Sequence, residues 1–435
     1  MTDNPECPLR IKIILSILSG KPLKLKNIRR NEHEPGLKDF EVNLLKLIDK
    51  LTSGTRVDIN ETGTSLYFVP GILLGGKVEH DCGLERSIGY FLQTILCMAP
   101  FTKKPMELTL TGVTNDPDDV SIDLIKYSTL PIFKRFIGND EGLELKISKR
   151  GAKPGGGGEV LFKCPTKMKL IPLNLTDPGK IKRIRGVAYA MRVAPAVCNR
   201  MVEKAKGVLL KLLPDVYIVS DHQKKDTAGN SPAFGLTLVA ETINGTFLCA
   251  EACSTPKGSD NENPNVPEDI ALKATHNLLE EIYRGGCVDS SNQYLAYLFM
   301  VLNQKDVSRI LSGILSPFSI HFMRGIRETF GVKFKIEPCR NQEMDINHKK
   351  LMQEKEEAKN AKKKKRKRNL QLPAEINASE NETDVDEEEE QKKKKIKLEE
   401  EEKEKSIKDY LKLGHEKLLL SCFGIGFTNL TKTFV

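Results

Sequence analysis

Tryptophan is absent from this sequence, and aromatic residues make up only 6% of it. No run of 18 apolar residues occurs, which argues against a transmembrane helix. The first residues, Met1–Pro5, are polar and lack the apolar region of a signal peptide. Ten cysteines are scattered without a Cys-x-x-Cys pair, so neither a zinc finger nor a redox motif is expected. These absences indicate a reduced cytosolic or nuclear protein with no membrane partner.

The composition that remains is that of a chain able to bury a core. The 435 residues are 39% apolar and 29% charged, and this length predicts two to three domains. Lys and Arg number 68 against 59 Asp and Glu, which gives a net charge of +9. Residues 346–410 hold 19 basic and 18 acidic residues, so most of the excess lies outside that stretch. A mildly basic folded part fits a surface that faces a polyanion.

A charged segment interrupts the chain at residues 343–410. Its charges come in blocks, with a basic run at Lys362–Arg368, an acidic run at Asp384–Glu390 and a second basic run at Lys392–Lys395. Such blocks bury too little apolar surface to offset chain entropy, so we predict a disordered insertion. Lysine runs of this kind are also typical of nuclear-localisation signals.

A helix followed by a strand recurs in the rest of the chain. The apolar residues of 37–51 follow helical spacing, and 56–60 alternates as a strand. The same succession is expected at 85–97 with 106–110, at 121–136 with 143–147, and at 320–330 with 332–336. A further strand is expected at 418–422. This repetition of architecture predicts an α/β fold with helices packed on sheets.

Residues 182–283 have a different pattern. Expected here are helices at 195–212 and 267–284 and strands at 216–220, 234–241 and 246–251. Together these elements suffice for a compact domain. We therefore predict a large domain of residues 1–181, 284–342 and 411–435, with a smaller α/β domain inserted at 182–283.

The most unusual local string is Arg150–Val160, which contains four consecutive glycines. Glycine lets a backbone approach a ligand closely, so one interpretation is an anion-binding loop to which Arg150 and Lys153 add positive charge. The alternative is a turn between strands at 143–147 and 160–163. We favour the turn, because a phosphate-binding loop carries its Lys-Ser/Thr directly before a helix.

A loop with three aspartates, Gly112–Asp119, separates a strand from a helix. Its carboxylates could hold a metal for phosphodiester chemistry. We favour the alternative that Asn115 or Asp116 caps the following helix, where such residues are common without catalysis. His80, Asp81 and Cys82 are adjacent in sequence, but adjacency does not make a catalytic triad. The seven histidines do not have the spacing of metal ligands. No catalytic, metal or cofactor site is expected from these patterns.

Two groups of cations are candidate contacts for RNA or a partner. Four of them fall within six residues, namely Lys180, Lys182, Arg183 and Arg185. Cations so placed position nucleic acid through its phosphates, but a solvated strand or linker face is an equal alternative. Arg324 and Arg327 lie one turn apart on the expected helix at 320–330, where an ordinary exposed helix face is the default interpretation.

Longer strings resemble the RNA 3′-terminal phosphate cyclase family. They are HDCGLERSIGYFLQ at 80–93, GVTND at 112–116 and KRGAKPGGGGEV at 149–160. Four others are similar to a eukaryotic cyclase-like branch that acts in ribosome assembly: GLKDFE at 36–41, LTDPGKIKRIRG at 175–186, EEIYRGGCVDSSNQ at 280–293 and GIGFTNLTK at 424–432. The resemblance covers nearly the whole chain outside the charged insertion.

The resemblance implies a large domain of three repeated small α/β units, similar to the C-terminal domain of translation initiation factor three, with an inserted thioredoxin-like domain. Family members that are cyclases adenylylate a histidine near the C-terminus and carry an acidic, Gly-rich nucleotide loop near the N-terminus. Here Gly424–Asn429 contains no histidine, and Pro5–Arg10 contains no glycine. A covalent nucleotidyl enzyme needs its nucleophile, so no cyclase activity and no cofactor are expected.

By resemblance, the protein is expected in the nucleus and nucleolus as a non-catalytic factor of the small-subunit processome. Its expected partners are a ribosome-assembly GTPase, other processome proteins and pre-rRNA, and its expected role is to support early cleavages towards 18S rRNA. Two enzymatic alternatives stay open. One is a pre-rRNA endonuclease, and the less favoured one is a residual RNA 3′-phosphate cyclase.

Overall fold

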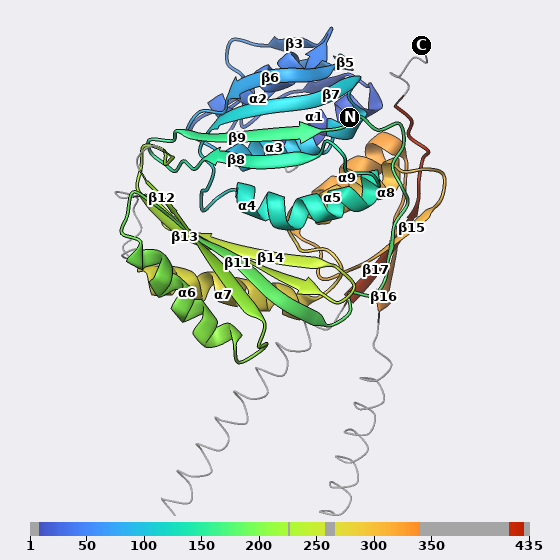
Figure 1. Cartoon of the computed structure of the whole chain (residues 1–435). Helices are drawn as coiled ribbons and strands as arrows, with labels where there is room; N and C mark the ends of the chain where they lie inside the picture. The colour runs from blue at the N-terminus through green and yellow to red at the C-terminus, as the bar shows by residue number, and fades with distance from the viewer. Residues whose placement is uncertain (1–7, 225–226, 257–265, 340–416, 430–435) are drawn as a thin grey trace, which may run out of the picture. The chain divides into compact units, whose positions relative to one another are not determined.

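The computed structural model describes residues 8–224, 227–256, 266–339 and 417–429 (Figure 1). The chain divides into one unit of Met1–Glu337 with Leu418–Val435 and a second unit of Pro338–Lys417. The predicted disordered insertion lies in the second unit, outside the described residues.

The middle of this unit is a four-stranded sheet with helices. Its elements are β6 (Gly75–Asp81), α3 (Ile88–Leu96), the 3-10 turn η1 (Ala99–Phe101), β7 (Lys104–Gly112), α4 (Ile122–Leu124), the π turn η2 (Ile125–Thr129), α5 (Leu130–Ile137), β8 (Glu144–Lys149) and β9 (Gly158–Cys164). The strand order is β6-β7-β9-β8, with β6 parallel to β7 and the other pairs antiparallel. Strand β7 forms where alternate residues are apolar, because Met106, Leu108 and Leu110 all enter the core from one face.

Two other sheets share part of this topology. The first contains α1 (Leu9–Ser19), β1 (Leu23–Leu25), α2 (Asp39–Leu51), β3 (Arg56–Ile59) and β4 (Leu66–Val69), beside the short pair β2 (Thr52–Ser53) and β5 (Ile72–Leu73). The last contains β10 (Asn174–Leu175), α8 (Gln293–Leu302), β15 (Val307–Ser312), α9 (Pro317–Phe330), β16 (Lys335–Cys339) and β17 (Lys417–Phe423). Their strand orders are β1-β4-β3 and β10-β15-β17-β16. In all three sheets the last strand lies between the two strands that precede it in sequence.

The chain between β10 and α8 forms a fourth sheet with its own core. Its elements are β11 (Ile181–Met191), α6 (Ala196–Leu209), β12 (Val216–Gln223), β13 (Ala233–Thr242), β14 (Phe247–Cys253) and α7 (Pro267–Arg284). The strand order is β12-β11-β13-β14, with β12 parallel to β11. Helices α6 and α7 cover one face (Figure 1), where Ile184, Met201 and Leu278 are buried in a cluster separate from the main core. On the other face, Leu124 of α4 packs against Val239.

The mixed α/β class predicted from the sequence is confirmed, and the predicted elements lie within a few residues of observed ones. The helix expected at 195–212, for example, is α6. The bounds of the large and inserted domains stay a prediction. Helix α8 was among the elements missed, because all ten of its residues are buried and an element that is apolar on every side shows no helical period. Across the described ranges, no helix combines the length and apolarity needed to cross a membrane.

Candidate functional site

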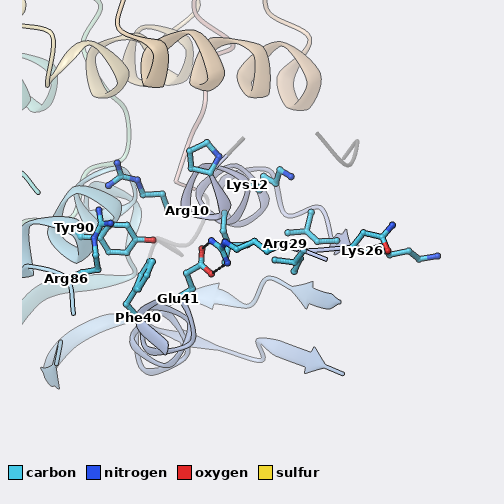
Figure 2. Close-up of a pocket in the computed structure, with 13 residues that line it drawn as sticks. Arg10, Lys12, Lys26, Arg29, Phe40, Glu41, Arg86 and Tyr90 are labelled. Carbon is cyan, nitrogen blue, oxygen red and sulfur yellow. Dashed lines mark hydrogen bonds and ion pairs between the residues drawn. The ribbon is translucent and has the colours of Figure 1, made fainter. Parts of the chain in front are cut away.

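A cavity of about 570 Å³ opens at the N-terminal end of α1 (Figure 2). Five cationic side chains and one carboxylate line it: Arg10, Lys12, Lys26, Arg29, Arg86 and Glu41. In Figure 2, Arg10 and Arg86 lie near the ring of Tyr90, while Lys12 and Lys26 lie on the far side of the Arg29–Glu41 pair. The lining has a strong excess of positive charge, so the cavity suits an anionic ligand.

The backbone adds to this positive potential. Helix α1 begins after Pro8, no side chain among the residues from Pro8 onward that the structure describes caps it, and its first turn contains no acidic residue. The amide groups at a helix start carry a partial positive charge, which attracts anions. Next to this helix end, Asn27 and Arg29 have positive φ values of 57° and 47°. Non-glycine residues adopt such angles rarely, and they are concentrated at functional sites.

Arg10 is held by aromatic rings. Its guanidinium carbon lies 4.4 Å from the centre of the Phe318 ring and 5.0 Å from that of Tyr90. Its Nη1 donates a hydrogen bond of 3.0 Å to the side-chain oxygen of Gln93. Burial lowers the pKa of Arg10, and within the described residues no carboxylate forms an ion pair with it. An anion that enters the cavity therefore meets a fixed cation whose charge is not already paired.

The other two arginines of the cavity are compensated. Arg29 forms a two-pronged ion pair with Glu41, with nitrogen–oxygen distances of 2.6 and 2.7 Å. Arg86 pairs with Asp119, its Nε donating at 2.9 Å, and its guanidinium lies 4.9 Å from the centre of the Tyr90 ring. These pairs fix both guanidinium groups in place, which leaves Arg10 as the arginine most available to a ligand.

Arg150, a predicted anion contact, is buried instead. Its Nε donates to Asp221 at 2.8 Å and its Nη2 to Asp123 at 2.9 Å. Its guanidinium also lies 4.9 Å from the ring centre of Tyr189. The side chain is 4% exposed, so in this structure it joins the middle sheet to the fourth sheet and offers no surface charge to RNA.

The glycine string forms a turn between β8 and β9, as predicted. Its amides do not surround an open anion site, because the amide of Gly155 donates to Ser231 at 2.8 Å. The carbonyl of Gly156 accepts from the amide of Asn230 at 3.0 Å. The turn thus packs against the loop between β12 and β13. Lys153, the other candidate in this string, pairs with Asp116 at 2.7 Å.

The loop with three aspartates differs from the prediction in one respect. Neither Asn115 nor Asp116 caps the next helix, because Ser121 does so by accepting a hydrogen bond from the amide of Leu124 at 3.1 Å. Asp116 and Asp119 are occupied by cations, Lys153 and Arg86 respectively. In the part of the chain that the structure describes, no group of three or more His, Cys, Asp or Glu residues is arranged to hold a metal ion.

The remaining predicted contacts lie away from the cavity. Lys180 and Lys182 are exposed at the start of β11. Arg183 pairs with Glu241 at 2.6 Å and Arg185 with Asp215 at 2.7 Å, so the four cations of this group are not equivalent. Arg324 and Arg327 are exposed on α9. The opposite side of that helix faces α1, where a Cβ atom on Gly325 would lie 2.7 Å from Leu15.

Sequence reasoning missed the residues of the basic cavity. Arg86 and Tyr90 were inside the family string at 80–93, but nothing local marked them as facing a cavity. Arg29 belongs to the basic stretch 24–30, and that cluster of charge was the one signal available. Arg10 lies in the segment noted only for its missing glycines. The packing of α1 against α3 and α9 brings these distant positions together.

The segment Gly424–Asn429 is packed beside η1. Phe427 contacts Phe101 with ring centres 4.8 Å apart. The side-chain amide of Asn429 donates to the carbonyl oxygen of Thr102 at 3.2 Å. His415, the histidine next to this segment in sequence, lies outside the described residues.

Comparison with known proteins places these features in a family context. A sequence model of the RNA 3′-terminal phosphate cyclase family matches residues 7–336. The RNA 3′-terminal phosphate cyclase-like protein of Mus musculus is 53% identical over 346 residues, which cover 79% of this chain and 92% of the mouse protein. The rRNA processing protein rcl1 of Schizosaccharomyces pombe is 42% identical over 340 residues, which cover 77% of this chain and 92% of the yeast protein. These similarities extend across nearly all of the described fold.

Proposed function

Because this chain belongs to the RNA 3′-terminal phosphate cyclase family, we propose that it is a non-catalytic member that acts in rRNA processing. Its similarity to the fission-yeast rRNA processing protein supports the process. The lack of a histidine in Gly424–Asn429 supports the non-catalytic role, because nucleotidyl transfer through the enzyme needs a nucleophile. The proposed setting is the small-subunit processome of the nucleolus, where the protein acts with a ribosome-assembly GTPase towards 18S rRNA.

The proposed fold has three copies of one small α/β unit and an inserted thioredoxin-like domain. The shared strand order of the three sheets supports the repeats. For the inserted domain, the support is the order β12-β11-β13-β14, the parallel pair β11 and β12, and the two helices on one face. In this arrangement the basic cavity lies in the first repeat, where that repeat contacts α3 and α9.

The single observation that carries the RNA-binding part of the proposal is Arg10. A guanidinium held between two aromatic rings stands at a helix start, and within the described ranges it has no carboxylate partner and that helix start has no side-chain cap. A phosphate of single-stranded RNA would receive charge-assisted hydrogen bonds from Arg10 and the helix amides. Lys12 and Lys26 would add long-range attraction.

Complementation tests this proposal directly. Cells depleted of the protein should accumulate unprocessed precursors of 18S rRNA, and the wild-type chain should restore processing. Arg10→Gln should restore it poorly, whereas Arg56→Gln, which changes an arginine that is 71% exposed on β3, should restore it fully. Normal precursor levels after depletion would reject the rRNA-processing role. Full rescue by Arg10→Gln would reject the cavity as the RNA site.

The enzymatic alternatives need separate tests. Incubation with ATP and RNA 3′-phosphate should give neither a covalent AMP adduct nor a cyclic phosphate, and either product would contradict the non-catalytic role. An endonuclease should cut a pre-rRNA fragment in the presence of a divalent metal and lose that activity in Asp116→Ala. The ion pair of Asp116 with Lys153 opposes this second alternative, because it occupies the carboxylate that a metal would need.

A further inference from the structure

An acidic groove lies between the loop Gly112–Ser121 and helix α7. It consists of an inner cavity of about 140 Å³ and an outer, more open one of about 380 Å³, which share Pro117, Asp119, Glu251 and Asn277 as lining residues. Six carboxylates line the two cavities: Asp116, Asp118, Asp119, Glu251, Glu280 and Glu281. Their cationic neighbours in the lining are Lys273 and Arg284. Four of these carboxylates are paired with cations, namely Asp116 with Lys153, Asp119 with Arg86, and Glu280 and Glu281 with Arg284. Asp118 and Glu251 form no ion pair within the described residues, so these two supply the negative charge that the groove offers to a ligand.

A second feature of the inner cavity, independent of the carboxylates, is a buried tyrosine hydroxyl. Tyr189 lines it and is only 1% exposed, yet its hydroxyl has no hydrogen-bond partner in the described residues. The thiol of Cys253 lies beside the hydroxyl and can form only a weak hydrogen bond with it. A buried hydroxyl without a partner destabilises the folded state, so its retention needs another reason. Gly235 makes room for this ring, because a Cβ atom there would lie 2.5 Å from the hydroxyl oxygen.

Glu251 lies in the same cavity. One of its oxygens accepts a 2.8 Å hydrogen bond from the amide of Ser121, and the other contacts the Ser121 hydroxyl. No lysine or arginine of the described chain forms an ion pair with it. Burial raises the pKa of Glu251 to about 7. A cation beside this carboxylate would favour its ionised form, which the free protein disfavours.

We propose that this groove binds a basic peptide segment of a partner protein and that one arginine of the segment enters the inner cavity. A guanidinium has five donors and no acceptor, so it can serve Glu251 and the Tyr189 hydroxyl oxygen at once. Flanking basic residues would lie in the outer cavity, near the exposed carboxylate of Asp118. The same charges repel RNA phosphates, so the groove selects a protein rather than a nucleic acid.

The experiment measures peptide binding to the full chain by fluorescence anisotropy. The probe is a labelled peptide of about ten residues that alternates arginine with glycine, and its matched control replaces every arginine by citrulline, which keeps the shape and removes the charge. The arginine peptide should bind and the citrulline peptide should not. Glu251→Gln combined with Asp118→Asn should weaken binding by about tenfold or more. Glu61→Gln, an exposed change in the turn between β3 and β4, should leave binding unchanged.

Tyr189→Phe separates a binding role from a structural one. It removes a hydroxyl without a partner, so the free protein should be no less stable to urea, while peptide affinity should fall about threefold. Equal peptide affinity in the wild type and the Glu251/Asp118 double variant would overturn the proposal. Loss of RNA binding in that double variant would overturn it in favour of RNA. Stronger peptide binding after replacement of Lys362–Arg368 by Gly and Ser would instead assign the groove to the chain's own basic run.

Discussion

The basic cavity at the start of α1 and the acidic groove beside α7 meet at one ion pair. Arg86 lines the cavity, Asp119 lines the groove, and the two side chains bind each other. On one side of this pair the lining charges are mostly positive, and on the other side they are mostly negative. Two surfaces of opposite sign this close together fit the two partners proposed above, RNA on one and a basic protein segment on the other.

The two regions also differ in how their charges are held. In the cavity, Arg10 is supported by aromatic rings, so its charge stays available. In the groove, Glu251 is supported by hydrogen bonds from Ser121 and is buried far enough to disfavour its charge. An anionic ligand would therefore be attracted to Arg10, which is already charged. The ionised form of Glu251, in contrast, becomes favourable mainly when a cation binds beside it.

The largest expected effect concerns the buried ion pair of Arg150 with Asp123. Arg150→Met should lower the free energy of unfolding by about 3–5 kcal/mol, because the carboxylate of Asp123 would be left buried without its cation. Urea unfolding measures this loss. The matched change Arg56→Met, in an exposed pair with Asp58, should cost less than about 1 kcal/mol. Equal costs for the two changes would show that burial does not distinguish these pairs.

The next effect separates the two regions by ligand. Arg10→Gln should weaken binding of single-stranded RNA by about tenfold and reduce the slope of log affinity against log salt by about one. Glu251→Gln should leave RNA affinity and slope unchanged. Filter binding over a salt series provides both quantities. An unchanged slope in Arg10→Gln would mean that this guanidinium contacts no phosphate.

A smaller effect depends on pH. Burial raises the pKa of Glu251 from its ordinary 4.5 to about 7, so the folded chain holds this proton more tightly than the unfolded chain. Stability from that proton is present at low pH and is lost as pH rises from about 4.5 to about 7. Glu251→Gln cannot titrate, so its urea midpoint should fall less across this window. Burial also raises the pKa of Asp289 to about 7, so part of the decline should persist in the variant. Identical pH profiles would contradict the shift at Glu251.

The smallest effect concerns the cations at the start of β11. Lys180→Ala with Lys182→Ala should weaken RNA binding about twofold. Both side chains are exposed, so the contact of each with a phosphate contributes little to the affinity. Arg185→Ala is the comparison, since its guanidinium already pairs with Asp215. A loss as large as that of Arg10→Gln would move the main RNA contact from the cavity to this strand.

Sequence alone determined the α/β class, the positions of most amphipathic elements and the family. Amphipathic helices such as α2 and alternating strands such as β7 carry a period that is visible in one dimension, because one face is apolar and the other is not. The sequence strings that resemble the family can be recognised without knowing which contacts they make. The turn at 150–158 was predicted for the same local reason, since its glycines and flanking strands adjoin in sequence.

Only the tertiary structure decided which charges are available. Arg150 and Lys153 are as basic in sequence as Arg10, yet both are paired with carboxylates from other segments, Asp123, Asp221 and Asp116. The identity of the capping residue, Ser121, likewise depends on the residue at which α4 begins. Whether a charge can bind a ligand depends on burial and on partners brought from tens or hundreds of residues away. Local sequence therefore records that a charge exists, whereas long-range packing determines whether it is already neutralised.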